Sequence, residues 1–192
     1  MATIAHDSAL AERVRELEDR FALNELVARY CAAVDDCDRE ALLELFTEDA
    51  SFGSTTGSGA TGRETLADFA LGRAATEDWS IHYPHTHIID FVSEDEARGV
   101  VLMHAEMGWE GDRCIRAAMR YNDEYKRVDG KWRFAKRLVQ FYYCMDLGTF
   151  ANGYDNTHRK QWPYVAKADL PESLETWRQL HPDHPNNPDN GS

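Results

Sequence analysis

Apolar positions recur at steps of three and four residues through the first part of the chain. They are Leu10, Val14, Leu17 and Phe21, followed by Leu23, Leu26, Val27, Tyr30 and Val34. This spacing predicts a long amphipathic helix, which Asp7 or Ser8 would cap at its start and the polar run at residues 35–38 would end. A second, short helix is predicted from one apolar face, made of Ala41, Leu42, Leu45 and Phe46.

Residues 50–62, with the sequence ASFGSTTGSGATG, predict a short strand that runs into a loop rich in Gly, Ser and Thr. The glycines do not match the spacing of phosphate-binding loops, so no such role is assigned to them. Residues 62–64 then open another amphipathic helix, whose apolar side chains are Leu66, Phe69, Ala70 and Leu71.

The hydrophobic period changes to two in the middle of the chain, which is typical of strands. Strands are predicted at residues 81–92, 97–109, 114–128 and 132–145. The connections between them are short, and Asp129-Gly130 is a strong hairpin signal. Helices followed by strands that are joined through hairpins indicate an α+β fold with a mostly antiparallel sheet.

The regular pattern fades after residue 146. Residues 147–180 contain several aromatic side chains, so we expect this extension to pack on the domain or on a neighbouring subunit, with a short helix at 170–180 introduced by Pro171. Residues 181–192 are rich in Pro and Asn and are predicted to be disordered. The expected organisation is therefore one domain at residues 1–146, the extension, and this tail.

Composition narrows the class of protein. The 192 residues suffice for one domain with a sizeable core. A net charge of −13 argues against binding to nucleic acids or anionic membranes, because both need clustered Lys and Arg. No apolar run approaches the ~18 residues that a membrane span needs, and no secretory signal is visible, so a cytoplasmic location is expected. The scattered cysteines, expected to be free thiols, are Cys31, Cys37, Cys114 and Cys144.

The segment SIHYPHTHIID contains His82, His85 and His87, which are candidates for either metal ligands or a catalytic base. On a strand, His85 and His87 share a face, and His104 with Glu106 could complete a metal site. His82 has the opposite parity unless Pro84 introduces a bulge. The metal interpretation is therefore the weaker one, with His87 expected to pack in the core and no metal or other cofactor expected.

Three segments carry a resemblance to a known family. They are ARYCAAVDDCDREALLELFTEDASF (residues 28–52), SIHYPHTHIIDFVSEDEARG (80–99) and YNDEYKRVDGKWRFAKR (121–137). Together they resemble the SnoaL-like branch of the nuclear transport factor 2-like superfamily. The resemblance implies a cone-shaped, curved antiparallel sheet whose N-terminal helices close a deep pocket. It also implies a homo-oligomer, a trimer as in similar elimination enzymes or a dimer as elsewhere in the superfamily.

Within this branch, the chain is similar to dehydratases of bile acids and dehydrochlorinases of hexachlorocyclohexane. The resemblance implies a base made of His82 and Asp35, with Tyr30 and Arg137 as polar stabilisers of a leaving group or oxyanion. It also implies a place for His85 in the pocket. Two departures are visible, because Tyr30 replaces the dehydrochlorinases' lysine, and Phe141 stands where the bile acid enzymes have an arginine.

The residues themselves leave alternatives open. Asp35 could merely end the first helix, His82 and Tyr30 could be core residues, and Arg137 could be a solvated neighbour of Lys136. On an ideal helix Tyr30 and Asp35 lie about 140° apart. Strand alternation groups Arg137 with Val139 and Phe141.

A pocket lined by aromatic side chains would suit a small hydrophobic ring that carries oxygen atoms. The candidates for substrate contact, besides His85, are Phe52, Trp79, Tyr83, Trp109, Phe141 and Tyr143. The function expected is a cofactor-independent lyase, with dehydration first and loss of formaldehyde also compatible. The alternatives are an isomerase, an epoxide hydrolase and a non-catalytic ligand-binding protein.

Overall fold

A computed structural model describes residues 2–55, 57–109, 113–149, 159–161, 165–184 and 186–190, with side chains from residue 8 onward. The helices are α1 (Ala2–Asp35), α2 (Arg39–Leu45), α3 (Arg63–Ala74) and α4 (Glu175–Leu180), and a 3-10 helix spans Pro188–Asn190. The strands are β1 (Phe46–Ser54), β2 (Gly59–Thr61), β3 (Trp79–Phe91), β4 (Glu96–Trp109), β5 (Arg113–Val128) and β6 (Lys131–Asp146).

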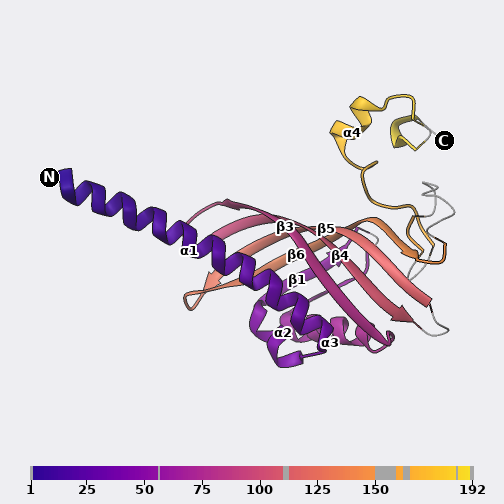
Figure 1. Ribbon diagram of the computed structural model, residues 1–192, viewed down its shortest axis with the longest axis horizontal. Coiled ribbons are helices and arrows are strands. Elements are labelled where there is room, and N and C mark those ends of the chain that lie inside the picture. Colours follow the sequence, from indigo (N-terminus) through magenta and orange to yellow (C-terminus); the bar gives the residue numbers. More distant parts are fainter. Residues whose placement is uncertain are drawn as a thin grey trace.

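The strands form one six-stranded sheet in the order β2-β1-β6-β5-β4-β3. Strands β1 and β6 pair in parallel, and the other neighbours pair antiparallel. The sheet is curved and open, and α1, α2 and α3 cover one of its faces (Figure 1). This arrangement confirms the predicted α+β class and the curved antiparallel sheet with N-terminal helices.

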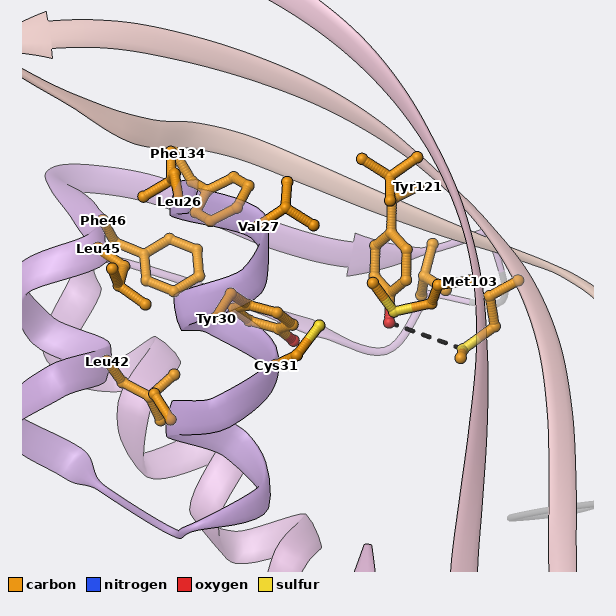
Figure 2. Close-up of a cluster of buried hydrophobic side chains, with 14 of the residues drawn as sticks. Leu26, Val27, Tyr30, Cys31, Leu42, Leu45, Phe46, Met103, Tyr121 and Phe134 are labelled. Atoms are coloured by element: carbon orange, nitrogen blue, oxygen red, sulfur yellow. Dashed lines mark hydrogen bonds between the residues drawn. The ribbon is translucent and has the colours of Figure 1, made fainter. Parts of the chain in front are cut away.

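The core lies between α1 and the sheet. Leu23, Leu26 and Tyr30 are buried on one side of the helix, and the rings of Phe46 and Phe134 pack edge-on against Tyr30 (Figure 2). Burial of each large apolar side chain of this kind contributes about 1.5–3 kcal/mol. The second half of α1 is therefore fixed on the sheet by packing.

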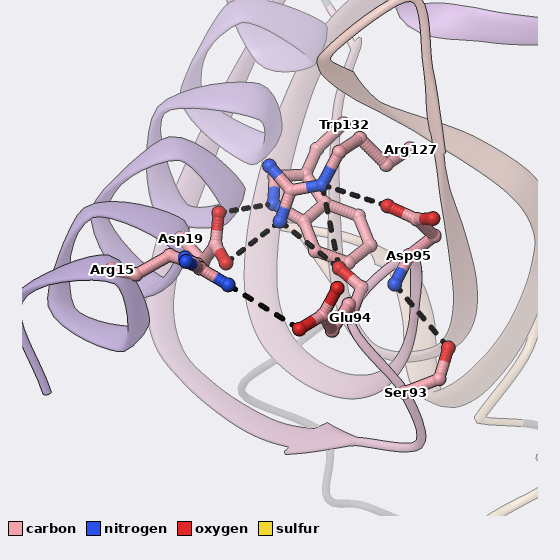
Figure 3. A network of polar contacts seen from close by, with 7 residues as sticks. All are labelled: Arg15, Asp19, Ser93, Glu94, Asp95, Arg127 and Trp132. Carbon is pink, nitrogen blue, oxygen red and sulfur yellow. Dashed lines mark hydrogen bonds and ion pairs between the residues drawn. The ribbon is translucent and has the colours of Figure 1, made fainter. Parts of the chain in front are cut away.

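A polar network fixes α1 at Asp19, where the core-facing half of the helix begins (Figure 3). Asp19 accepts a hydrogen bond from Trp132 Nε1 at 2.9 Å and pairs with Arg127 Nη2 at 2.7 Å. The Arg127 guanidinium also lies over the Trp132 ring, 4.4 Å from its centroid. N-terminal to this anchor, α1 projects beyond the sheet (Figure 1).

The connection from α1 to β1 follows ordinary capping chemistry. Asp38 accepts a hydrogen bond from the backbone N–H of Ala41 at 3.0 Å and so caps α2. The sequence predicted that Phe46 belongs to this helix. That boundary is wrong, because α2 ends at Leu45 and Phe46 adopts an extended backbone as the first residue of β1.

The hairpin predicted at Asp129-Gly130 is confirmed. Both residues have left-handed backbones, with φ of 52° at Asp129 and 74° at Gly130. Positive φ at both central positions is characteristic of the type I′ turn that joins twisted antiparallel strands.

The sheet has several register shifts, and two of them decide which candidate site residues face the helices. The register of β3 against β4 shifts between Pro84 and Thr86, which leaves His85 as an extra residue. The register of β5 against β6 shifts where Tyr143 pairs with Ala118 and Phe141 with Met119, so Tyr142 is extra. Each bulge exchanges the faces of the residues that follow it.

The described part of the extension returns along β6. The backbones of Lys160 and Cys144 form an isolated parallel β-bridge. The backbone N–H groups of Asp169 and Leu170 donate to the carbonyl of Phe141. Leu170 is fully buried, whereas α4 lies away from the sheet (Figure 1). The helix predicted at 170–180 is shorter than expected, and the division into domain, extension and disordered tail stays a prediction.

None of the helices in the described ranges combines the length and apolarity needed to cross a bilayer.

Candidate active site

Asp35 and His82 meet between the end of α1 and the start of β3. His82 Nδ1 lies 2.6 Å from Asp35 Oδ1, and the backbone N–H of His82 donates to Asp35 Oδ2 at 2.8 Å. The Ser80 hydroxyl donates to Asp35 Oδ1 at 3.1 Å. One strand therefore supplies every hydrogen bond described for this carboxylate.

The position of Asp35 is electrostatically unusual. It is the last residue of α1, where the partial negative charge of the helix terminus disfavours a carboxylate. Burial also acts to raise the pKa of Asp35, but the hydrogen bonds and charge of His82, with the bond from Ser80, outweigh it and hold that pKa below its ordinary value. Asp35 is therefore ionised at neutral pH because β3 holds it.

An ionised Asp35 fixes the tautomer of His82. A carboxylate can only accept hydrogen bonds, so the proton of neutral His82 lies on Nδ1. Nε2 then carries the free lone pair. His82 also lines a cavity between the helices and the sheet. An oriented, neutral imidazole at a cavity wall can act as a general base toward a molecule bound there.

The cavity lies between the helices and the sheet and has a volume of about 90 Å³, several times the ~10–15 Å³ that one water molecule needs. It is mostly apolar. The lining residues from the helices and β1 are Tyr30, Val34, Leu42, Phe46, Phe52, Leu66, Ala67, Phe69, Ala70, Arg73, Ala74 and Glu77. Those from the other strands are His82, Ala105, Met107, Ala117, Met119, Tyr121, Val139, Phe141 and Cys144.

Tyr30 from α1 and Tyr121 from β5 are buried and line this cavity (Figure 2). Burial raises the pKa of Tyr30 to about 12 and raises that of Tyr121 as well. Both hydroxyls are therefore protonated at neutral pH and can donate. Among the described residues, the hydrogen bond of the Tyr121 hydroxyl is a long one to Met119 Sδ, at 3.6 Å, so this hydroxyl can be redirected toward a ligand.

Arg137 is fully buried but is not among the residues that line the cavity. Its Nε pairs with Asp123 Oδ1 at 3.0 Å, and its guanidinium lies 4.2 Å from the ring centroids of both Tyr30 and Tyr121. Val139 and Phe141 share its buried side of β6, as alternation predicts. Arg137 therefore lies behind the two tyrosines rather than at the cavity surface.

A chain of hydrogen bonds continues from Asp123 toward β3. The Tyr125 hydroxyl donates to Asp123 Oδ2 at 2.9 Å and so accepts from His87 Nε2 at 2.9 Å. Burial and the charge of Arg137 lower the pKa of His87 to about 4. His87 is thus neutral and fixed among core groups, and it does not line the cavity.

The aromatic candidates separate into two groups. Phe52 and Phe141 line the cavity, whereas Trp79, Tyr83, Trp109 and Tyr143 do not. Trp79 and Tyr83 lie on the opposite face of β3 from His82, as strand alternation requires. Tyr143 is turned away by the extra residue Tyr142 and lies near His104 on the outer face, with ring centroids 6.2 Å apart.

His85 is also outside the cavity, because it is the extra residue of the β3 bulge. Its Nε2 lies 2.6 Å from His104 Nδ1 on the outer face of the sheet. Across the part of the chain that the structure describes, no three or more His, Cys, Asp or Glu side chains gather as a metal site would require.

Arg73 and Glu77, at the end of α3 and just beyond it, line the cavity and were not predicted from the sequence. Burial raises the pKa of Glu77, although Arg73 and His82 act to lower it. Only the fold shows that this side of α3 faces the cavity.

The fold agrees with comparison to known proteins. The chain belongs to the SnoaL-like domain family, whose family model matches residues 15–138.

Individual relatives are enzymes. The chain is 33% identical over 126 residues to gamma-hexachlorocyclohexane dehydrochlorinase of Sphingobium indicum, in an alignment that covers 63% of this chain and 79% of that protein. A crystal structure of a type 2 hexachlorocyclohexane dehydrochlorinase superposes with a TM-score of 0.66 and 26% identity, over 70% of this chain and 93% of that one. A scytalone dehydratase candidate from Novosphingobium aromaticivorans gives a TM-score of 0.66 and 27% identity, over 70% and 91%.

Proposed function

We propose that this protein is a cofactor-independent lyase that acts on a small hydrophobic cyclic or aromatic molecule carrying a hydroxyl or similar leaving group. The observation that carries the proposal is the Asp35–His82 pair, with Nδ1 held at 2.6 Å from the carboxylate and the imidazole at the cavity. A protein that only binds a ligand has no need of a base oriented in this way.

In this mechanism, His82 Nε2 takes a proton from a carbon of the substrate. The electrons of that C–H bond form the new double bond, and the leaving group departs from the neighbouring carbon with its bonding electrons. Asp35 stabilises the imidazolium while it exists. When the leaving group is hydroxide, the proton held by His82 passes to it, so that water is released and neutral imidazole is restored. General-base catalysis of this kind contributes about 10²–10⁴-fold to the rate.

The tyrosines assist departure of the leaving group. The hydroxyl of Tyr30 donates to the oxygen that gains negative charge, and Tyr121 can support it from the sheet side. Arg137 acts through them, since a cation stacked 4.2 Å from each ring favours developing negative charge on the phenols. Arg137 is thus a positioning residue in this scheme, and Asp123 keeps it in place.

The similar proteins support an elimination and differ in the group that is lost. The dehydrochlorinases are named for removal of hydrogen chloride, and the scytalone dehydratase candidate for removal of water. Dehydration is the first choice here because neutral tyrosine hydroxyls suit an oxygen leaving group. Loss of formaldehyde would use the same base differently: His82 takes the hydroxyl proton of a hydroxymethyl group, the C–C bond to that group breaks, and its electrons form the double bond as the leaving group departs from the neighbouring carbon. The aromatic side chains on the cavity wall, Phe52 and Phe141 among them, favour a ring.

The test is a screen of hydroxylated and halogenated cyclic and aromatic compounds, with product masses recorded for the wild type and His82→Gln. We expect loss of water or hydrogen halide, a primary isotope effect when the abstracted hydrogen is replaced by deuterium, and turnover by His82→Gln that is about 10²–10⁴-fold lower than that of the wild type. A product of unchanged mass would indicate an isomerase, and addition of water would indicate an epoxide hydrolase. Turnover by His82→Gln at the wild-type rate would overturn the mechanism.

A further inference from the structure

The projecting half of α1 carries a stripe of exposed apolar residues, defined here as Leu10, Val14, Leu17 and Phe21. Their exposed fractions are 53%, 44%, 67% and 73%. Scattered exposed apolar residues are ordinary, but a contiguous apolar patch of large side chains marks an interaction surface.

The described part of the protein leaves this stripe exposed. At about 100° per residue, the four side chains fall within an arc of about 60° on the helix. The core-facing residues Leu23, Leu26 and Tyr30 lie about 150–170° from the centre of that arc. The anchor at Asp19, whose position on the helix is about 170° from the centre of that arc, therefore holds α1 with the exposed stripe turned away from the sheet.

The spacing of the stripe is that of a coiled coil. Successive members are separated by four, three and four residues, which is the alternation of d and a positions in a heptad repeat. Leu10 and Leu17 then occupy d positions, and Val14 and Phe21 occupy a positions. From this spacing and the charges beside it, we propose that the stripe pairs in parallel with the same stripe of a second copy of this chain.

The charges flanking the stripe select a second copy in parallel orientation. Arg13 and Arg20 precede the a positions and are g residues, whereas Glu18 and Glu25 follow the d positions and are e residues. In a parallel pair each g residue meets the e residue five positions later on the partner helix. Arg13 then faces Glu18, and Arg20 faces Glu25, in both directions. An antiparallel pair would instead bring Arg against Arg and Glu against Glu.

The geometry leaves room for both domains and both cavities. Because the stripe lies opposite the core-facing side of α1, a two-fold axis along the paired helices places the two domains on opposite sides. No residue that lines the cavity belongs to the stripe. This surface is separate from the outer face of the sheet, and it joins copies whether or not the sheet also associates.

The first test is the mass of the full chain by sedimentation velocity at about 10–100 μM, where weak specific interfaces are populated. We expect the double variant Leu17→Glu/Phe21→Glu to have half the mass of the wild type, because a charge at each position prevents the helices from meeting. Leu180→Glu on α4 is the matched control, since Leu180 is equally exposed at 75%, and its mass should equal that of the wild type. Unchanged circular dichroism would verify that the double variant is folded.

A wild-type protein that is monomeric over this range, or a mass that is the same in wild type and double variant, would overturn the proposal. Binding of the stripe to neutral lipid vesicles by a monomeric wild type would do so as well.

The second test addresses register and orientation through Arg13 and Glu18, because Arg20 already donates to Glu16 and to the carbonyl of Ile89. Arg13→Glu and Glu18→Arg should each weaken self-association, since each creates a like-charged pair. Mixing the two variants should restore association as a heterodimer, because both contacts between positions 13 and 18 of the two chains then join opposite charges. A mixture that associates no better than either variant alone would refute the parallel register.

Discussion

His82 and His85, both on β3, each lie equally close to a polar partner, but the partners give the two imidazoles different chemistry. His82 lies 2.6 Å from Asp35 on the helix-covered face, and His85 lies 2.6 Å from His104 on the outer face. The first partner is a carboxylate whose pKa is lowered, so it orients a base and stabilises its protonated form. The second partner is another imidazole, so protonation of both rings would place two positive charges next to each other, where they repel.

The difference arises from one extra residue in the strand. Without the bulge at His85, alternation would place His82 and His87 on opposite faces. The bulge sends both toward the helices and leaves His85 outside. Residue type and spacing alone therefore say little about a histidine; the partner and the face decide what it can do.

The largest expected effect separates the two pairs by activity. His82→Gln should lower turnover by about 10²–10⁴-fold, because it removes the base. The matched change His85→Gln should leave turnover within about twofold, as is typical of a surface substitution. Steady-state kinetics on a substrate found in the screen measures both. Equal losses in the two variants would contradict the assignment of His82 as the base.

The next effect concerns the partner of the base. Asp35→Asn should lower turnover by about 10²-fold or more, because a neutral amide neither fixes the productive tautomer nor stabilises imidazolium. His104→Gln, which changes the partner of the outer pair, is the control and should have a small effect. The decrease should appear in kcat, with KM little changed, since Asp35 does not line the cavity. A loss confined to KM would argue against an orienting role.

A smaller effect is expected from Tyr30, which lines the same cavity as His82. Tyr30→Phe should lower turnover about 10- to 100-fold, the range for loss of one hydrogen bond to a charged group. Tyr143→Phe, near His104 on the outer face, should leave turnover unchanged. If the two variants behave alike, Tyr30 does not donate to the leaving group.

The smallest effect is a difference in acid sensitivity. Burial, together with the charges of His85 and Arg116, lowers the pKa of His104 below its ordinary 6.5. Its contribution to stability is therefore complete above pH 6.5 and is lost as the pH falls through the lowered value. The pKa of Asp35 is lowered below its ordinary 3.8, so its contribution is complete above pH 3.8 and is lost only in stronger acid. As the pH falls from 6.5 toward 3.8, the His85–His104 pair should therefore weaken while the Asp35–His82 pair persists.

Urea unfolding of the wild type and His104→Gln at a series of pH values measures this difference. The wild type should lose more stability than the variant as the pH falls below 6.5. Subtraction of the two curves removes the contribution of His87, whose low pKa acts in both proteins. Parallel curves would show that the outer pair does not depend on protonation.

The sequence predicted most of the fold because its periods are local and strong. The alternation at residues 81–145 marked the strands, and Asp129-Gly130 marked a turn that needs two left-handed backbones. Phe46 was misplaced because its apolar side chain continues the pattern of α2, and only tertiary pairing with β6 makes it extended.

The site was predicted less completely than the fold. The resemblance pointed to Asp35 and His82, which the structure brings together, although their catalytic role stays a prediction. The positions of Trp79 and Tyr83 on the outer face of the sheet could have been predicted from the sequence, because strict alternation along the strand places both opposite His82. Tyr143 depended on a bulge that no residue in the sequence marks, whereas Pro84 had indicated that a bulge was possible beside His85. Arg73 and Glu77 depended on which side of α3 faces the sheet, and that is decided by packing.

The bulge at His85 also determines how β3 should tolerate change. The side chains at Ser80 and His82, and then at His87, Ile89 and Phe91, are the ones turned inward. A saturation scan along β3 should therefore alternate between sensitive and tolerant positions, pass through a tolerant run at 83–86, and resume with its phase reversed. Deleting His85 would remove the extra residue and leave His82 and His87 four positions apart, so plain alternation would keep both turned inward. Loss of this one codon should therefore be tolerated better than loss of the codon for Ile88, which would exchange the faces of the residues on one side of it.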